Sequence, residues 1–220
     1  RSFNRNMPEE INRIITDNLS SFLLCPSNIS KENLLKEGIT KGVHIVGDVM
    51  FDIFKKNEKY FSDNSKFNDY CLLTLHRAEN TNESSLKNRI NQIKSLDMKV
   101  IFPMHPRTKK CIDSYGIILP KNIKVINPKS WLEMMNLVKN SKFVVTDSGG
   151  LQKEAFWHNK FCFTLRSETE WIETIRLGMN CLVNLNDNIN LDLINTSNQI
   201  NPYGNGKTSE KLVSLIVNSK

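Results

Sequence analysis

Three absences narrow the class of protein to which this 220-residue sequence can belong. No window approaches the roughly 18 consecutive apolar residues of a membrane-spanning helix, so we expect no membrane association. The net charge is +7, but lysines and arginines are spread among acidic residues without a long basic run. No zinc-finger, helix-turn-helix or RNA-binding signature accompanies them, and we expect no nucleic-acid partner. The Gly-x-Gly-x-x-Gly fingerprint of nicotinamide-binding proteins is also missing, so we expect no cofactor of that kind.

The cysteines give no sign of a disulfide framework or a metal site. The five residues are Cys25, Cys71, Cys111, Cys162 and Cys181, and they lack the Cys-x-x-Cys spacing of metal ligands. All except Cys111 fall in strand-like runs, where a thiol packs as a small apolar group. An odd, scattered set without a signal-peptide pattern predicts the reducing cytoplasm, and we expect no metal.

From about residue 40 the sequence alternates strand-like and helix-like segments. The strand-like runs are 43–47, 70–76, 99–105, 123–128, 142–147, 161–166 and 181–184. The helix candidates are 49–57, 83–96, 130–140, 150–158 and 169–178. The strand-like runs are apolar without strict polar alternation, which is typical of parallel strands covered on both faces. We therefore predict an α/β fold with a doubly wound, parallel, Rossmann-like sheet.

The two ends of the chain have a different character. Residues 1–40 predict a helix over 7–20, a short strand over 22–27 and a helix over 30–38 with Ser30 as its N-cap. These elements have no sheet of their own, whereas 201–220 predict a turn and a closing helix. We accordingly expect junction elements over 1–40, a main domain over 41–200 and a closing segment over 201–220.

The stretch VVTDSGGLQKEAF (144–156) predicts a strand, a Ser-Gly-Gly turn and the start of a helix. Glycines can adopt backbone conformations that other residues avoid. A turn of this kind before a helix presents free backbone N–H groups, which favour a phosphate or another anion. Read alone, it is equally compatible with a tight turn that binds nothing.

Polar residues follow five of the predicted strands at the carboxyl end, where open α/β sheets bind ligands. They are His76-Arg77, His105-Pro106-Arg107, Pro128-Lys129, Asp147-Ser148-Gly149-Gly150 and Arg166. Together they describe a cleft for a multiply charged anion, which favours a phosphate-bearing ligand.

Seven motifs then match one family in order and with compatible spacing. They are RSFNRNMPEEINR (1–13), VGDVMFD (46–52), TLHRAENTN (74–82), FPMHPRTKK (102–110), TDSGGLQKEA (146–155), LRSETEWIET (165–174) and NPYGNGK (201–207). With these motifs the chain resembles the non-hydrolysing UDP-N-acetylglucosamine 2-epimerases, which have the two-domain fold of GT-B glycosyltransferases. The combination of HRAEN and TDSGGLQKEA is the most specific part of the match.

The resemblance implies an isomerase that converts UDP-GlcNAc into UDP-ManNAc by eliminating UDP and adding it back. It also implies a homodimer and a further amino-terminal domain of roughly 120 residues, which supplies an Asp and a Glu. On this reading the chain is the carboxyl-terminal half of the GT-B-like fold, with its UDP-binding domain over 41–200. We expect it to bind UDP but to have little activity by itself.

The resemblance also assigns UDP-binding residues. Ser148, Gly149 and Gly150 bind the diphosphate, and Glu154 accepts hydrogen bonds from the ribose hydroxyls. Arg77 contacts either a phosphate or an allosteric UDP-sugar. Lys129 and Arg166 are further strand-end cations of the site, and Met134 packs on uracil unless the nearby Trp131 does so.

Three residues are expected to be catalytic. His76 matches a family histidine that touches the departing phosphate. Glu9 and Arg13 align with a catalytic carboxylate and arginine, although from the residues alone they form an i,i+4 surface ion pair.

Three alternatives remain open from the sequence. Trp171 replaces a family arginine, and the resulting TEW is similar to members acting on UDP-2,3-diacetamido-2,3-dideoxyglucuronate. A UDP-sugar-dependent GT-B glycosyltransferase would share the UDP-binding residues, and a UDP-binding module without chemistry of its own also fits this chain.

Overall fold

The computed structural model describes residues 1–62, 69–194 and 200–218. The chain divides into two compact units, residues 1–59 with 199–220 and residues 60–198. Each unit is described by itself. The sequence suggested boundaries at 40 and 200, whereas contacts within the chain join 41–59 to the first unit.

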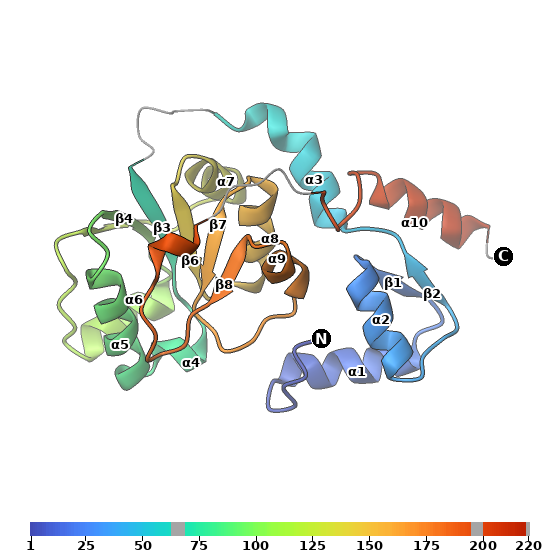
Figure 1. Cartoon of the computed structure of the whole chain (residues 1–220), viewed down its shortest axis with the longest axis horizontal. Coiled ribbons are helices and arrows are strands. Elements are labelled where there is room, and N and C mark those ends of the chain that lie inside the picture. The colour runs from blue at the N-terminus through green and yellow to red at the C-terminus, as the bar shows by residue number, and fades with distance from the viewer. Residues whose placement is uncertain (63–68, 195–199, 219–220) are drawn as a thin grey trace. The chain divides into compact units, whose positions relative to one another are not determined.

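The second unit is built on a six-stranded parallel sheet in the order β5-β4-β3-β6-β7-β8 (Figure 1). Its strands are β3 (Tyr70–Thr74), β4 (Lys99–Pro103), β5 (Ile123–Ile126), β6 (Phe143–Thr146), β7 (Phe161–Thr164) and β8 (Asn180–Leu182). Its α-helices are α4 (Ala78–Thr81), α5 (Glu83–Lys94), α6 (Pro106–Ser114), α7 (Trp131–Lys139), α8 (Gly149–Trp157) and α9 (Ile172–Arg176). The order reverses between β3 and β6, which confirms the predicted doubly wound α/β fold.

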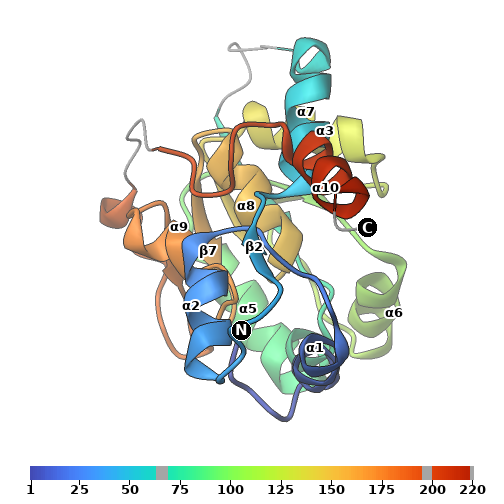
Figure 2. The same ribbon diagram turned by 90° about the vertical axis from the view of Figure 1, so that its right-hand side faces the viewer.

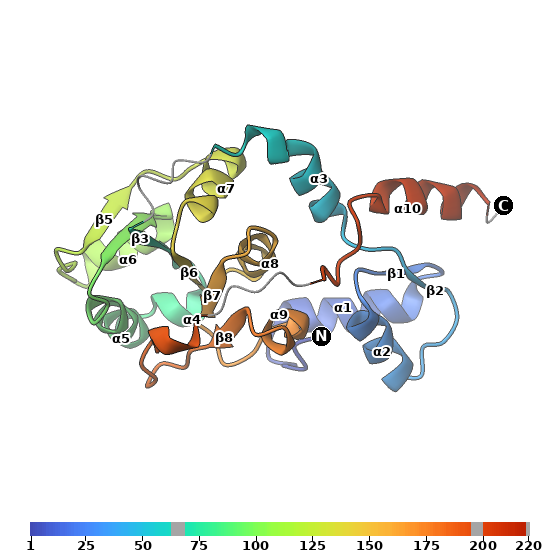
Figure 3. The ribbon, with the colours of Figure 1, turned by 45° about the horizontal axis from the view of Figure 1, so that its top comes forward.

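Burial of the sheet on both faces explains the apolar runs of the sequence. Every residue of β6 and β7 is buried. Figure 3 shows α5 on one side of the sheet and α7 on the other. Phe143 and Phe163 pack edge to face in the core, with ring centroids 5.4 Å apart.

The first unit contains a small sheet that the sequence did not predict. Its elements are α1 (Pro8–Leu19), β1 (Leu23–Cys25), α2 (Asn28–Lys36), β2 (Val43–Ile45), α3 (Val49–Asn57) and α10 (Thr208–Val217), and a 3-10 turn follows at Glu58–Tyr60. The two strands β1 and β2 pair in parallel. The expectations that residues 1–40 have no sheet and that 43–47 belong to the main sheet are therefore wrong. The reason is a local core of Leu23, Cys25 and Leu34, against which Val43 packs.

The start of α2 also differs from the expectation. The N-cap is Ser27, whose hydroxyl accepts a hydrogen bond from the backbone N–H of Ser30 at 3.3 Å. Ser30 lies inside the helix. Both serines suit a helix N-terminus, and the extended backbone of Ser27 decides between them.

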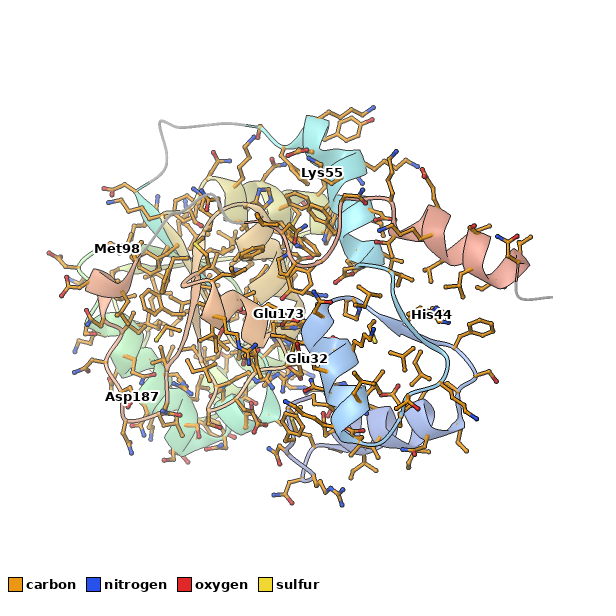
Figure 4. All side chains as sticks on the ribbon, turned by 45° about the vertical axis from the view of Figure 1, so that its right-hand side comes forward. Glu32, His44, Lys55, Met98, Glu173 and Asp187 are labelled. Carbon is orange, nitrogen blue, oxygen red and sulfur yellow. The ribbon has the colours of Figure 1, made fainter. Side chains whose placement is uncertain are left out.

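Figure 2 shows α3 and α10 side by side, and the carboxylate of Asp52 joins them. Lys55, which is labelled in Figure 4, lies on α3 about one turn after Asp52. Asp52 of α3 accepts hydrogen bonds from the backbone N–H groups of Thr208 and Ser209, at 2.9 and 2.6 Å. Asp52 therefore caps α10, whose own N-cap residue forms no side-chain cap.

We expect Asp52→Asn to destabilise the first unit by about 1 kcal/mol at neutral pH, because the amide keeps one acceptor but sets its NH₂ donor against the second backbone N–H. Burial by itself raises the pKa of Asp52, but hydrogen bonds from Ser209 and Thr208 hold it below the ordinary 3.8. The stabilisation is thus complete above pH about 4 and is lost as the pH falls through the lowered pKa. Urea unfolding at pH 7 and pH 3 measures this, because the difference between wild type and variant should shrink at pH 3. Asp113→Asn, at an exposed position of α6, is the control and should behave like wild type at both values.

Candidate functional site

A pocket of about 290 Å³ lies within the second unit at the carboxyl ends of neighbouring strands. Its lining comes from the ends of β3 and β4, from the segments that follow β3 to β6, and from the first two turns of α7 and α8. The lining residues are Thr74, Leu75, His76, Pro103, His105, Pro128, Lys129, Trp131, Met134, Met135, Ser148, Leu151 and Glu154. The fold thus brings together polar residues from four of the five strand ends that the sequence singled out.

The amino terminus of α8 supplies one wall of the pocket. Ser148 is the N-cap, and its hydroxyl accepts a long hydrogen bond from the N–H of Leu151 at 3.5 Å. Gly149 and Gly150 begin the helix, and neither has a positive φ. The expectation that these glycines supply an unusual backbone conformation is therefore wrong.

Small size is the property of these glycines that matters. The N–H groups of the first helical residues have no partner within the helix. A Cβ built at Gly150 would meet none of the described residues within 4 Å, so this part of the helix terminus is open. An anion can therefore approach the N–H groups, and the positive end of the helix dipole favours it.

His76 is held by a buried carboxylate. Its Nδ1 lies 3.1 Å from Oδ1 of Asp147, which is fully buried directly after β6. The backbone N–H groups of His76 and Arg77 also donate to Asp147, at 2.9 and 2.8 Å. Burial by itself raises the pKa of Asp147, but the hydrogen bonds from His76 and Arg77 lower it below its ordinary range, so the carboxylate is ionised.

Sequence reasoning placed Asp147 at a strand end but gave it no role. The strand order carries the missing signal, because β3 pairs with β6 and Thr74 lies opposite Thr146. The residues that follow these two threonines therefore meet. His105 was also left without a role, and its ring lies 6.1 Å from that of His76.

Trp131, Met134 and Glu154 line the opposite part of the pocket. The indole Nε1–H of Trp131 donates to Oε1 of Glu154 at 2.8 Å, which fixes the ring. Lys129 also lines the pocket, and it forms a 2.9 Å ion pair with Glu133. The pocket thus offers a flat aromatic or thioether surface beside a carboxylate and a lysine.

The pocket lining lacks four of the predicted binding residues, which are Arg77, Gly149, Gly150 and Arg166. The side chain of Arg166 is 1% exposed and forms an ion pair with Glu170 at 3.0 Å. The guanidinium of Arg77 lies 3.9 Å from the carboxylate of Glu79. Both follow strands of the sheet, but their side chains lie outside the pocket lining.

Glu9 and Arg13 lie on α1 of the first unit. The expectation that these two residues form an ion pair with each other is wrong. Arg13 instead donates to Oε2 of Glu10 at 2.8 Å, and Glu10 is buried while Glu9 is exposed. Glu10 also accepts hydrogen bonds from the backbone of Ser2 and Phe3, so it anchors the segment before α1.

No helix of the described residues is both long and apolar enough to cross a membrane. Among the same residues, no cluster of three or more histidine, cysteine or acidic side chains could hold a metal ion.

Known proteins with this fold and site were found by sequence and by structure. The family model described as UDP-N-acetylglucosamine 2-epimerase matches residues 1–217. The UDP-N-acetylglucosamine 2-epimerase of Methanocaldococcus jannaschii is 41% identical over 100% of this chain and 67% of its own length. A UDP-2,3-diacetamido-2,3-dideoxy-D-glucuronate 2-epimerase of Pseudomonas aeruginosa is 38% identical over 98% of this chain and 65% of its own length.

A crystal structure of the M. jannaschii enzyme in complex with UDP-GlcNAc and UDP superimposes with a TM-score of 0.84. It has 39% identity and covers 99% of this chain and 67% of that one. The fold and the strand-end pocket therefore define a GT-B-like α/β protein. The chain belongs to the UDP-N-acetylglucosamine 2-epimerase family, and it spans about two thirds of the length of these relatives.

Proposed function

We propose that this chain binds the UDP part of a UDP-sugar in the pocket of the second unit. The observation that carries this proposal is the convergence of Ser148 at the terminus of α8 with His76, Lys129 and Glu154 on one 290 Å³ space. The terminus of α8 suits the diphosphate, and the carboxylate of Glu154 suits a ribose hydroxyl. Trp131 or Met134 offers the surface on which a uracil ring can lie.

The reaction that we propose for the whole protein is the 2-epimerisation of UDP-N-acetylglucosamine. A base removes the proton from C2 of the sugar, the electron pair forms the C1–C2 double bond, and the C1–O bond to UDP breaks. UDP then adds back to C1 while a proton reaches the other face of C2. UDP must stay bound between the two steps. His76, Glu9 and Arg13 are the catalytic residues of this proposal.

A second candidate differs only in the sugar. The Pseudomonas relative acts, by its name, on a UDP-2,3-diacetamido-2,3-dideoxy-D-glucuronate. Trp171 lies beside the helix terminus, because a Cβ built at Gly149 would be 3.8 Å from its Nε1. Incubating the full-length protein with each UDP-sugar and following C2 inversion by NMR distinguishes the two substrates.

The remaining proposals concern the setting of the protein. We propose a homodimer on the basis of the family resemblance, which sedimentation of the full-length protein tests. We also propose a reducing compartment such as the cytoplasm. The five free cysteines support this, since Cys25, Cys71 and Cys162 are buried as core residues.

Calorimetric titration of UDP into this chain tests the proposal. We expect wild type to bind UDP and Ser148→Tyr not to bind it, because the tyrosine ring fills the helix terminus. Glu154→Ala should bind UDP with an affinity reduced roughly tenfold or more. Glu83→Ala removes an acid whose partner is the exposed Lys87, and it should bind like wild type. A folded wild-type chain without affinity for UDP, or full affinity in both site variants, contradicts the proposal.

A further inference from the structure

Behind His76 runs a line of buried polar side chains that the proposed reaction does not use. His76 contacts Asp147, Asp147 contacts Asn80, and Asn80 contacts Arg89. The last three are 0%, 2% and 3% exposed. Burying two charges and an amide is costly unless each polar atom has a partner, so each member of the line depends on its neighbours.

Asp147 determines which nitrogen of His76 is available to a ligand. The ionised carboxylate can only accept hydrogen bonds, so Nδ1 of His76 must be the donor at their 3.1 Å contact. In the neutral imidazole the proton then sits on Nδ1, and Nε2 carries the lone pair. Since His76 lines the pocket, Nε2 is the atom that a bound molecule meets.

Asn80 is oriented by Arg89. A guanidinium can only donate, so the amide of Asn80 turns its Oδ1 toward Nε of Arg89, at 3.0 Å. This orientation leaves the amide NH₂ to donate to Oδ2 of Asp147 at 3.3 Å and to the carbonyl of Leu165 at 3.0 Å. With Arg89 in place, the opposite orientation of the amide would set two donors against each other.

Arg89 is itself fixed by acceptors on another segment. Its Nη1 donates to the carbonyls of Val183 and Asn184, at 2.9 and 3.1 Å, and to Oε1 of Gln92 at 2.9 Å. Gln92 in turn donates to the carbonyl of Asp187, at 2.6 Å, a residue labelled in Figure 4. The loop after β8 thus sets the position of Arg89 on α5.

We propose that Asn80 and Arg89 are positioning residues for His76, acting through Asp147. Arg89 orients the amide of Asn80, Asn80 holds the carboxylate of Asp147, and Asp147 keeps Nδ1 of His76 protonated and turned away from the pocket. The consequence for catalysis rests on the proposed function. The tautomer of His76 does not, because it is a property of this chain without any ligand.

The test measures the ¹⁵N signals of the His76 ring in this chain, in alkaline buffer. Wild type should show a protonated Nδ1 and an unprotonated Nε2. Asn80→Asp keeps an acceptor for Arg89 but replaces the amide donor by a second carboxyl. The proton that the two carboxyls share then resides part of the time on Asp147, which no longer accepts only. We expect both nitrogens to move toward the averaged signals of exchanging tautomers. Asn80→Ser, whose hydroxyl is too short to span both acceptors, should show the same change if Asn80→Asp does not fold.

The matched control is Asn140→Asp, at another buried amide of the same unit, which donates to the carbonyls of Ser62 and Asn136. It should leave the signals of His76 unchanged. Wild-type signals in both Asn80 variants, or an equal change in Asn140→Asp, overturn the inference. In an Asp147→Asn background, Asn80→Asp should add no further change, and independent effects would show that Asn80 does not act through Asp147.

UDP affinity separates this inference from the proposed function. If wild type binds UDP, Asn80→Asp should weaken binding roughly tenfold, as loss of a positioning partner does. If wild type does not bind UDP, the proposed function fails while the ¹⁵N signals still decide the inference.

Discussion

Replacing Gly47 by alanine is expected to destabilise the first unit by about 3 kcal/mol, which makes it one of the two most damaging changes considered. Gly47 joins β2 to α3 with a φ of +101°, in a region that residues with a side chain rarely adopt. An added Cβ would lie 2.6 Å from Oγ1 of Thr208 and 2.9 Å from the carbonyl oxygen of Tyr203. The second atom belongs to the backbone, so relief requires the chain before α10 to move.

The control separates backbone strain from the steric clash. Gly38 also has a positive φ, +80°, but a Cβ built there would meet none of the described residues within 4 Å. Gly38→Ala should therefore cost about 1 kcal/mol, from strain alone. Urea unfolding of the two variants measures the difference. Equal losses at Gly38 and Gly47 would mean that the close approach of residues 203–208 contributes nothing.

Arg89→Met is expected to destabilise the second unit by about 3 kcal/mol or more. Methionine fills a similar volume but leaves acceptors at Asn80, Gln92, Val183 and Asn184 without the donor that now serves them. It also removes a buried positive charge close to the ionised Asp147. Burial lowers the pKa of Arg89, and the charge of Asp147 acts against that decrease.

Lys87→Met is the matched control on the same helix. Lys87 is 51% exposed and pairs with Glu83, so its loss should change the free energy of unfolding by about 0.5 kcal/mol or less. Thermal and urea unfolding of the two variants give the comparison. If Arg89→Met were as stable as Lys87→Met, the buried network would contribute specificity of orientation but no stability.

The α/β class, the parallel sheet and most of its elements follow from the sequence alone. Apolar runs such as 142–147 and 161–166 are readable because strands buried on both faces need no polar alternation. The polar residues after them mark the binding edge for the same geometric reason. His76, Lys129 and Ser148 were named from their place after strands, and Glu154 and Met134 from the family resemblance. All five line the pocket.

Only the tertiary structure decided which charged residues pair and which stay open. Arg166 was predicted as a ligand contact, but Glu170 lies close enough to bind it in the interior. Arg13 pairs with Glu10 rather than Glu9, because Glu10 lies on the buried face of α1. Asp147 meets His76 only because β3 and β6 are neighbours in the sheet. Local patterns determine strands and helices, whereas the partner of a charge depends on chain segments that lie far apart in sequence.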